Sequence, residues 1–236
     1  MNVVDVVQNF KTIPFLFVGS GMSRRYYGLP DWEGLLSHFA QIVSTDEFIY
    51  NSYLSKAEGE ICKNGLLPKV AELIQRDFDQ KWFRDSSIRT LNEKELDFVK
   101  RGVSPFKVEI AAYIRRMCIE KEAMSEEIAL LEQISKHSIA GVITTNYDRF
   151  LEDHLNGFNT YIGQNQLVFS TLQGVAEIYK IHGSIDSPDT IVINDVDYSN
   201  FNQKSAYLAA KLMTIFVENP IIFMGYSISD KNIQGI

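Results

Sequence analysis

The sequence is poor in cysteine and contains no long apolar run. Its only two cysteines, Cys62 and Cys118, lie far apart, and neither belongs to a Cys-x-x-Cys pair. This spacing excludes a disulfide-rich domain and favours a reduced, cytoplasmic setting. No segment approaches the roughly 18 uninterrupted apolar residues of a membrane span, and Asp5 stands where a secretory signal would carry basic residues. We therefore expect a cytoplasmic protein with no membrane partner.

Basic residues are also in deficit. The 236 residues include 23 Lys and Arg against 30 Asp and Glu, which gives a formal net charge of −7. Such a balance argues against a broad phosphate-binding surface, so nucleic acid is not expected as a direct partner. A small local pocket for a phosphorylated ligand stays compatible with it. The apolar content of 45% is enough for an extensive core in one large domain or in a core plus a smaller lobe.

Short apolar segments alternate with segments of helical periodicity. Residues Pro14 to Val18 form an apolar run that ends in a glycine-rich turn, and Asp31 is a good N-cap for a helix whose apolar residues recur at helical spacing. Further strands are predicted at Ile139–Thr144, Glu177–Ile181, Thr190–Ile193 and Pro220–Met224, and further helices at about 147–156 and 205–217. This order predicts an α/β fold, Rossmann-like, with a mostly parallel sheet and helices on both faces.

The segment between about 44 and 138 shows helical spacing without a strong strand signal, so an inserted helical lobe is predicted there. Residues Ser229 to Ile236 have the pattern of a helix that opens and does not close. We therefore expect residues 1–236 to form one ligand-binding domain with this insertion, as the N-terminal part of a longer protein.

The first candidate for chemistry is Gly19-Ser20-Gly21-Met22-Ser23, directly after the first predicted strand. Backbone N–H groups of a glycine turn and the helix that follows it can hold a diphosphate, because no side chain keeps the phosphates away. Arg24 occupies the place of the third glycine of the dinucleotide fingerprint. A plain strand-to-helix turn is the alternative interpretation.

Three further predicted strand ends carry polar residues or glycine. Asn146 and Asp148 follow one strand, His182 follows another, and Gly225 with Ser227 follows the last. Carboxyl ends of parallel strands converge at one edge, so a shared ligand site is predicted. A histidine at such a junction can act as a general base near neutral pH. Helix capping by Asn146 and Asp148, and a structural role for His182, remain the alternatives.

These motifs, in this order, resemble the sirtuins. GSGMS at 19–23, GLPDW at 28–32, TTNYD at 144–148, IHG at 181–183 and GYS at 225–227 are similar to the sirtuin motifs GAGxS, GIPDF, TQNID, HG and GTS. Pro188, IVINDVDY at 191–198 and FMGYSISDKNI at 223–233 make the sequence more similar to bacterial sirtuin-like NAD hydrolases that act as effectors of anti-phage defence.

The resemblance implies that NAD+ is the substrate and that its nicotinamide–ribose bond is cleaved, giving nicotinamide and ADP-ribose. It implies that Asn146 orders the nicotinamide ribose and the attacking water, that His182 is the base, and that Asp148 holds the carboxamide. The remaining residues implied to bind NAD+ are Gly19, Ser20, Gly21, Ser23, Asp31, Trp32, Gly225 and Ser227. Asp31 and Trp32 would close over the nicotinamide end, although both also fit a capping and packing role.

The sequence departs from the sirtuin deacylases in its cysteines. A deacylase would carry four zinc-ligand cysteines after the HG motif, whereas no cysteine follows Cys118. Zinc is therefore not expected, and protein deacylation is disfavoured. The main alternative is a non-catalytic module that senses NAD or another nucleotide, which would need neither Asn146 nor His182. As an effector that causes abortive infection by NAD depletion, the protein would need restraint, so we expect a homo-oligomer, a regulatory domain or a phage-derived trigger.

Overall fold

The computed structural model describes residues 3–163, 166, 175–204 and 206–226. In this part of the chain a five-stranded sheet has the order β3-β4-β2-β1-β5, and every neighbouring pair is parallel. The strands are β1 Phe15–Val18, β2 Gly141–Thr144, β3 Asn159–Ile162, β4 Glu177–Lys180 and β5 Ile221–Met224. The predicted α/β fold with a parallel sheet is confirmed.

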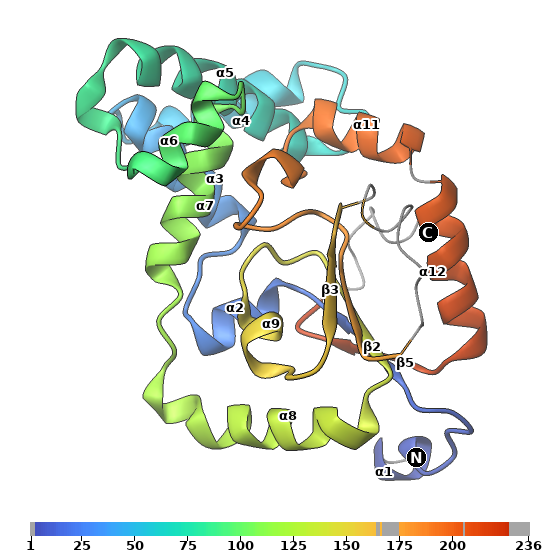
Figure 1. Cartoon of the computed structure of the whole chain (residues 1–236). Helices are drawn as coiled ribbons and strands as arrows, with labels where there is room; N and C mark the ends of the chain where they lie inside the picture. Colours follow the sequence, from blue (N-terminus) through green and yellow to red (C-terminus); the bar gives the residue numbers. More distant parts are fainter. Residues whose placement is uncertain (1–2, 164–165, 167–174, 205, 227–236) are drawn as a thin grey trace.

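The two faces of the sheet pack against different helices. On one face Phe17, Ile143 and Tyr179 contact a helix, α12 (Ala206–Glu218), through residues such as Leu208 and Leu212. On the other face alternate strand residues join the main core, to which α2 (Ser20–Tyr26), α3 (Trp32–Val43), α8 (Ser125–Ser138) and α9 (Phe150–His154) contribute. Figure 1 shows α12 and α9 on opposite sides of the strands. Helices therefore cover both faces, as a parallel sheet requires.

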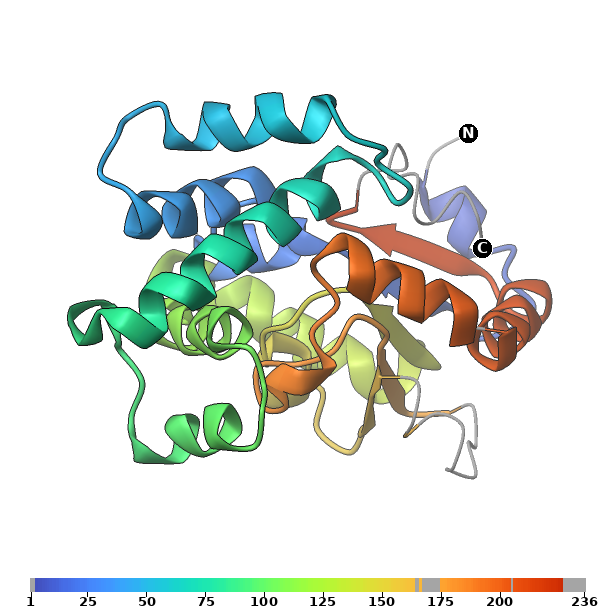
Figure 2. The ribbon, with the colours of Figure 1, turned by 90° about the horizontal axis from the view of Figure 1, so that it is seen from above.

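Residues 44 to 138 contain helices and no strand. In addition to α8, they form α4 Ile49–Glu58, α5 Leu66–Arg84, η1 Ser86–Ile88, α6 Glu93–Lys100, α7 Pro105–Met117 and η2 Glu122–Met124. Figures 1 and 2 show α3 to α7 gathered at one end of the molecule, whereas α8 runs separately beside the sheet. Phe39 of α3, Phe78 of α5 and Phe106 of α7 hold this group together, with ring centroids 5.3–5.6 Å apart.

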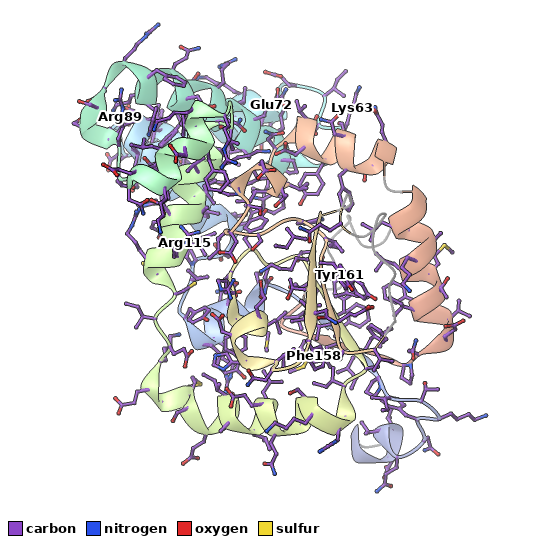
Figure 3. The ribbon with its side chains drawn as sticks, viewed as in Figure 1. Lys63, Glu72, Arg89, Arg115, Phe158 and Tyr161 are labelled. Atoms are coloured by element: carbon purple, nitrogen blue, oxygen red, sulfur yellow. The ribbon has the colours of Figure 1, made fainter. Side chains whose placement is uncertain are left out.

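Arg115 connects this helical group to the loop after β4. Its Nη2 donates to the backbone oxygen of Ile185 at 2.7 Å, and its Nη1 lies 2.7 Å from a carboxylate oxygen of Glu95. Figure 3 shows Arg115 between the helices of the lobe and the strands. The contact ties α7 to the segment that begins with His182. No helix in the described ranges is both long and apolar enough to cross a membrane.

The structure corrects several predicted elements. The strand predicted at Thr190–Ile193 is wrong: η3 (Pro188–Thr190) ends there, and Ile191 and Ile193 are buried without a strand partner in the described residues. The elements α1 (Val3–Val7), α2, β3 and α11 (Asp195–Lys204) were not predicted, and α2 occupies residues where a glycine turn was expected. Residues Ser229–Ile236, predicted to open a helix, lie outside the described residues.

Candidate functional site

A cavity of about 210 Å³ lies at the carboxyl edge of the sheet. Segments that follow β1, β2, β4 and β5 all contribute to its wall. Its lining residues are Ser20, Ser23, Leu29, Pro30, Asp31, Trp32, Leu35, Ile114, Thr145, Asn146, Tyr147, Asp148, His182, Tyr198, Gly225 and Tyr226. The volume is below the range of about 300–1,000 Å³ typical of whole-ligand pockets, so it encloses only part of a dinucleotide-sized molecule.

Asn146 is held between the first two strand ends. Its Nδ2 donates to the backbone oxygen of Gly19 at 2.9 Å and to Ser23 Oγ at 3.0 Å. Its own backbone N–H donates to Thr144 Oγ1 at 3.0 Å. Hydrogen bonds among the described residues thus use the amide nitrogen and leave Oδ1 as an acceptor. The amide is fixed in one orientation at the cavity wall.

Asp148 combines a capping contact with a contact across the site. Its Oδ1 accepts from the backbone N–H of Phe150 at 3.0 Å, and its Oδ2 accepts from Ser23 Oγ at 2.5 Å. The side chain is 5% exposed. Asp148 therefore does cap the backbone before α9, as the alternative interpretation predicted. Each of its carboxylate oxygens still has a second lone pair with which it can accept a hydrogen bond from a ligand.

His182 follows β4, and it lines the cavity from a different strand end than the glycine motif, which follows β1. It is 8% exposed, and its ring meets Tyr198 and Phe201 edge to face, with centroids 5.3 Å away in both cases. Its backbone oxygen accepts from Val192 at 3.0 Å. Aromatic packing from α11 thus fixes the imidazole beside the cavity that it lines.

The glycine motif has a different arrangement from the predicted one. No separate turn precedes the helix, because α2 begins at Ser20 with Gly19 as its N-cap. Gly19 N–H donates to Met224 O at 2.9 Å and Gly21 N–H donates to Gly225 O at 2.8 Å. Neither Gly19 nor Gly21 is among the lining residues. These two N–H groups bind the β5 segment, and a phosphate would have to use other donors of the motif.

Close backbone contact explains why glycine stands at these positions. A Cβ added to Gly21 would lie 2.6 Å from Gly225 Cα, and one added to Gly19 would lie 2.7 Å from Gly225 O. Gly225 itself has a φ of +62°, a region that favours glycine. The start of α2 and the segment at Gly225 are therefore packed backbone to backbone.

Asp31 and Trp32 combine the two roles that the sequence left open. Asp31 Oδ1 accepts from Gly34 N–H at 2.9 Å, which confirms the predicted N-cap, and Asp31 also lines the cavity. Trp32 packs against the main core, lies 6.0 Å from Tyr198 between ring centroids, and lines the same cavity. Its buried Nε1 has no hydrogen-bond partner among the described residues. Ser227 lies outside the described residues.

Three tyrosines of the wall, Tyr147, Tyr198 and Tyr226, were not identified as site residues from the sequence. Tyr147 donates its hydroxyl to Val192 O at 2.7 Å, and burial raises the pKa of this phenol well above its usual value. Tyr198 of α11 and Tyr226 after β5 also line the cavity. Tyr147 and Tyr226 stand inside the motifs TTNYD and GYS, so their position in these motifs could have identified them. The signal for Tyr198 was its place at the end of the IVINDVDY stretch, but α11 itself was not predicted because its sequence DVDYSNFNQK has weak helical amphipathicity.

Within the described ranges, no group of three or more His, Cys, Asp and Glu side chains is placed to hold a metal ion. Burial, followed by the negative charge of Asp148, raises the pKa of the Cys118 thiol to about 12, so this sulfur is a poor thiolate ligand.

Elemental analysis tests the expected absence of structural zinc. The protein should purify with far less than one zinc per chain, because structural zinc needs about four ligands and only two cysteines are present. A stoichiometric zinc content that survives dialysis against a chelator would contradict the prediction and restore the deacylase alternative.

Comparison with known proteins matches residues 140–236 to the SIR2-like domain. The chain is 25% identical over 217 residues to the NAD(+) hydrolase ThsA of Cytobacillus dafuensis, covering 87% of this chain and 40% of that protein. It is 30% identical over 97 residues to the protein of the same name from Bacillus cereus (strain MSX-D12), covering 39% of this chain and 20% of that protein. It is 29% identical over 104 residues to the defense-associated sirtuin 2 of Bacillus subtilis, covering 40% of this chain and 10% of that protein.

These similarities confirm the predicted resemblance to sirtuin-like NAD hydrolases of bacterial defence. The chain spans 40% or less of the length of the curated relatives it matches. The SIR2-like match begins beside β2 and includes the segments that carry Asn146, Asp148 and His182.

Proposed function

We propose that this chain, with its SIR2-like domain over residues 140–236, hydrolyses NAD+ at the nicotinamide–ribose bond to give nicotinamide and ADP-ribose. The observation that carries the proposal is the convergence of Asn146, Asp148 and His182 on one cavity at the carboxyl edge of a parallel sheet. Ligands of open α/β sheets bind at this edge. Two relatives, 25% and 30% identical to this chain over the matched residues, are named NAD(+) hydrolases.

Cleavage of this bond builds positive charge on the ribose, so the site must position the ring and offer a nucleophile at C1′. Asn146 Oδ1, which accepts no hydrogen bond among the described residues, would orient the ribose or the attacking water. His182 would accept a proton from that water or from a ribose hydroxyl. Water attacks C1′, nicotinamide leaves with the bonding electrons, and the proton passes to the histidine.

The polar contacts behind Asn146 support this assignment. Ser23 Oγ accepts from Asn146 and donates to Asp148, so the three side chains form one chain of hydrogen bonds. A preorganised amide does not need to reorient as charge develops. Asp148 retains lone pairs for the nicotinamide carboxamide, as the sirtuin resemblance implies.

The apolar part of the wall would hold the leaving group. Leu29, Leu35, Ile114 and Trp32 line the same cavity as the polar residues and would reduce the contact of a bound nicotinamide with bulk water. Exclusion of water strengthens the electrostatic contacts in the site. The Nε1 of Trp32, buried without a partner in the described part of the chain, could donate to a bound ligand.

The role of the whole protein extends this proposal. Relatives named for NAD hydrolysis and for defence suggest an NAD-depleting anti-phage effector in the cytoplasm. A homo-oligomer, a regulatory domain or a phage-derived trigger would restrain the activity, because uncontrolled NAD loss kills the host. A sensing module that binds NAD without turnover is the alternative, and the internal hydrogen bonds of Asn146 and Asp148 are compatible with it.

Incubation of the purified full-length protein with NAD+ tests the proposal directly. We expect nicotinamide and ADP-ribose to appear in equal amounts, measured by chromatography, because water is the acceptor. Heat-denatured protein is the control. Tight NAD+ binding without nicotinamide release, under activating conditions that include phage lysate, would favour the sensing module. A cyclic product would retain bond cleavage but replace water with an internal acceptor.

A further inference from the structure

Lys180 is a completely buried cation that does not line the cavity. It is the last residue of β4, its side chain is 0% exposed, and it pairs in register with Thr144 of β2. Its Nζ donates to the backbone oxygens of Tyr147, at 3.3 Å, and of Asp148. It also lies 2.7 Å from Glu152 Oε1 on α9. Two of its acceptors therefore belong to the turn that carries the polar wall of the cavity.

These contacts match the chemistry of an ammonium group. Lys has three N–H donors and no acceptor, and Lys180 has three acceptors. Glu152 is 9% exposed and supplies the compensating charge. Burial raises the pKa of Glu152, and its Oε2 has no partner among the described residues. The carboxylate therefore lies in an environment where the ammonium is its main stabilising contact.

Stability alone does not account for this pair. Taking two charges out of water costs several kcal/mol per ion, and apolar residues of similar volume are often equally or more stabilising. What apolar residues cannot do is bind two consecutive backbone carbonyls of a turn. The carbonyl groups of Tyr147 and Asp148 belong to the same short backbone segment as Asn146 and Asp148. Hydrogen bonds to these carbonyls therefore fix the backbone from which the two side chains extend. Both of those side chains line the cavity.

We propose that Lys180 is a positioning residue, which fixes the turn at 145–148 and thereby holds Asn146 and Asp148 at the reacting bond. The proposal rests on the proposed NAD+ hydrolysis for its effect on turnover. The anchoring of the turn can be measured without any activity. Lys180 contacts no ligand in this scheme and acts through the backbone.

The test uses a double variant, Lys180→Met with Glu152→Leu, in the full-length protein. It removes both charges together at similar side-chain volume, so neither is left unpaired in the core. Lys69→Met is the control, because Lys69 is also largely buried and pairs with Glu60 and Glu72, whereas none of its contacts among the described residues reaches the turn at 145–148. Backbone amide exchange over residues 145–150, steady-state kinetics and ADP-ribose affinity are measured for each.

In the double variant, amide exchange over 145–150 should rise by about 10-fold or more relative to the parent. The value of kcat should fall by about 10- to 100-fold, while KM and the affinity for ADP-ribose stay within about 3-fold. A purely structural role would instead weaken exchange protection across the sheet and ADP-ribose binding together. Unchanged exchange over 145–150 would overturn the proposal.

Glu152→Gln keeps the proposal testable if the double variant does not fold. It removes the counter-charge of the buried ammonium, so the protein as a whole should become less stable. Lys180 keeps its two carbonyl contacts, so exchange over 145–150, measured relative to exchange across the rest of the sheet, and kcat should stay within about 3-fold of the parent. The opposite result would be a fall in kcat and a rise in amide exchange over 145–150 as large as those expected for the double variant. The ion pair, and not the carbonyl contacts, would then be responsible, and the proposal would fail. A parent without turnover refutes the proposed function, whereas the exchange measurement still decides the anchoring.

Discussion

Replacing Asn146 or His182 with alanine should lower nicotinamide release by at least about 100-fold, the usual scale for removing a positioned acid–base group. His182→Ala removes the proton acceptor. Asn146→Ala removes the only described side-chain amide at the cavity wall, together with its bonds to Gly19 O and Ser23 Oγ. NAD+ affinity should change little in both, because other residues supply most of the wall. Initial rates and calorimetric NAD+ binding are the measurements.

Asn92→Ala is a control matched in stability. Asn92 caps α6 and accepts from Glu95 N–H at 3.1 Å, and it is not among the residues that line the cavity. Loss of such a cap costs about 1 kcal/mol, similar to the cost of the Asn146 hydrogen bonds. Its turnover should equal that of the parent. If Asn146→Ala and His182→Ala hydrolyse NAD+ at the parental rate, the assigned mechanism is wrong. If they unfold, both residues are structural.

Gly21→Ala should destabilise the protein by about 3 kcal/mol, the upper part of the usual range for overpacking. Alanine gains up to about 1 kcal/mol in helix propensity over glycine, but here the added Cβ would lie 2.6 Å from Gly225 Cα and 2.7 Å from Gly225 O. Both neighbours are backbone atoms that cannot rotate away, so the clash outweighs the propensity. Thermal melting should show a decrease of roughly 6–12 °C.

The same change should reduce NAD+ turnover, because Gly225 lines the cavity and would move away from α2. Gly59→Ala is the control. Gly59 has a φ of −79°, and its added Cβ would make only an ordinary contact of 3.5 Å with Lys56 O. Its melting temperature should stay within about 2 °C of the parent, given an effect of about 0.5 kcal/mol. If Gly21→Ala and the parent have the same melting temperature, the start of α2 and the segment at Gly225 are not packed as described.

The sequence identified four of the five strands. β1, β2 and β5 are predominantly apolar, and β4 carries two apolar residues in its sequence EIYK, so each gave a strand signal without tertiary context. In contrast, β3 is an edge strand with the mixed sequence NTYI, partly exposed along its length, so it lacks that signal. The apolar residues Ile191 and Ile193 suggested a strand, but they are buried as a loop. Burial and strand formation produce the same short apolar pattern.

For the site, strand ends were predictable because the edge of a parallel sheet brings them together. Asn146, Asp148 and His182 do line one cavity. Which backbone groups are already bonded could not be predicted. Gly21 N–H is used by Gly225 O, a contact between residues at opposite ends of the sequence. Lys180 gave no signal, because a single lysine at a strand end is indistinguishable from a solvated one until its acceptors are known.

The order of strands in the sheet also determines when the cavity can exist during synthesis. The inner strand β1 pairs Phe15 with Ile221, so one of its two neighbouring strands, β5, is among the last described segments to be translated. Gly225 and Tyr226 complete the wall that Ser20 and Ser23 begin. Pairing of β1 with β5 joins segments from opposite ends of the described chain, and such non-local pairing is expected to be slow. A nascent chain therefore carries Asn146 and His182 for some time before it has a cavity for them to line.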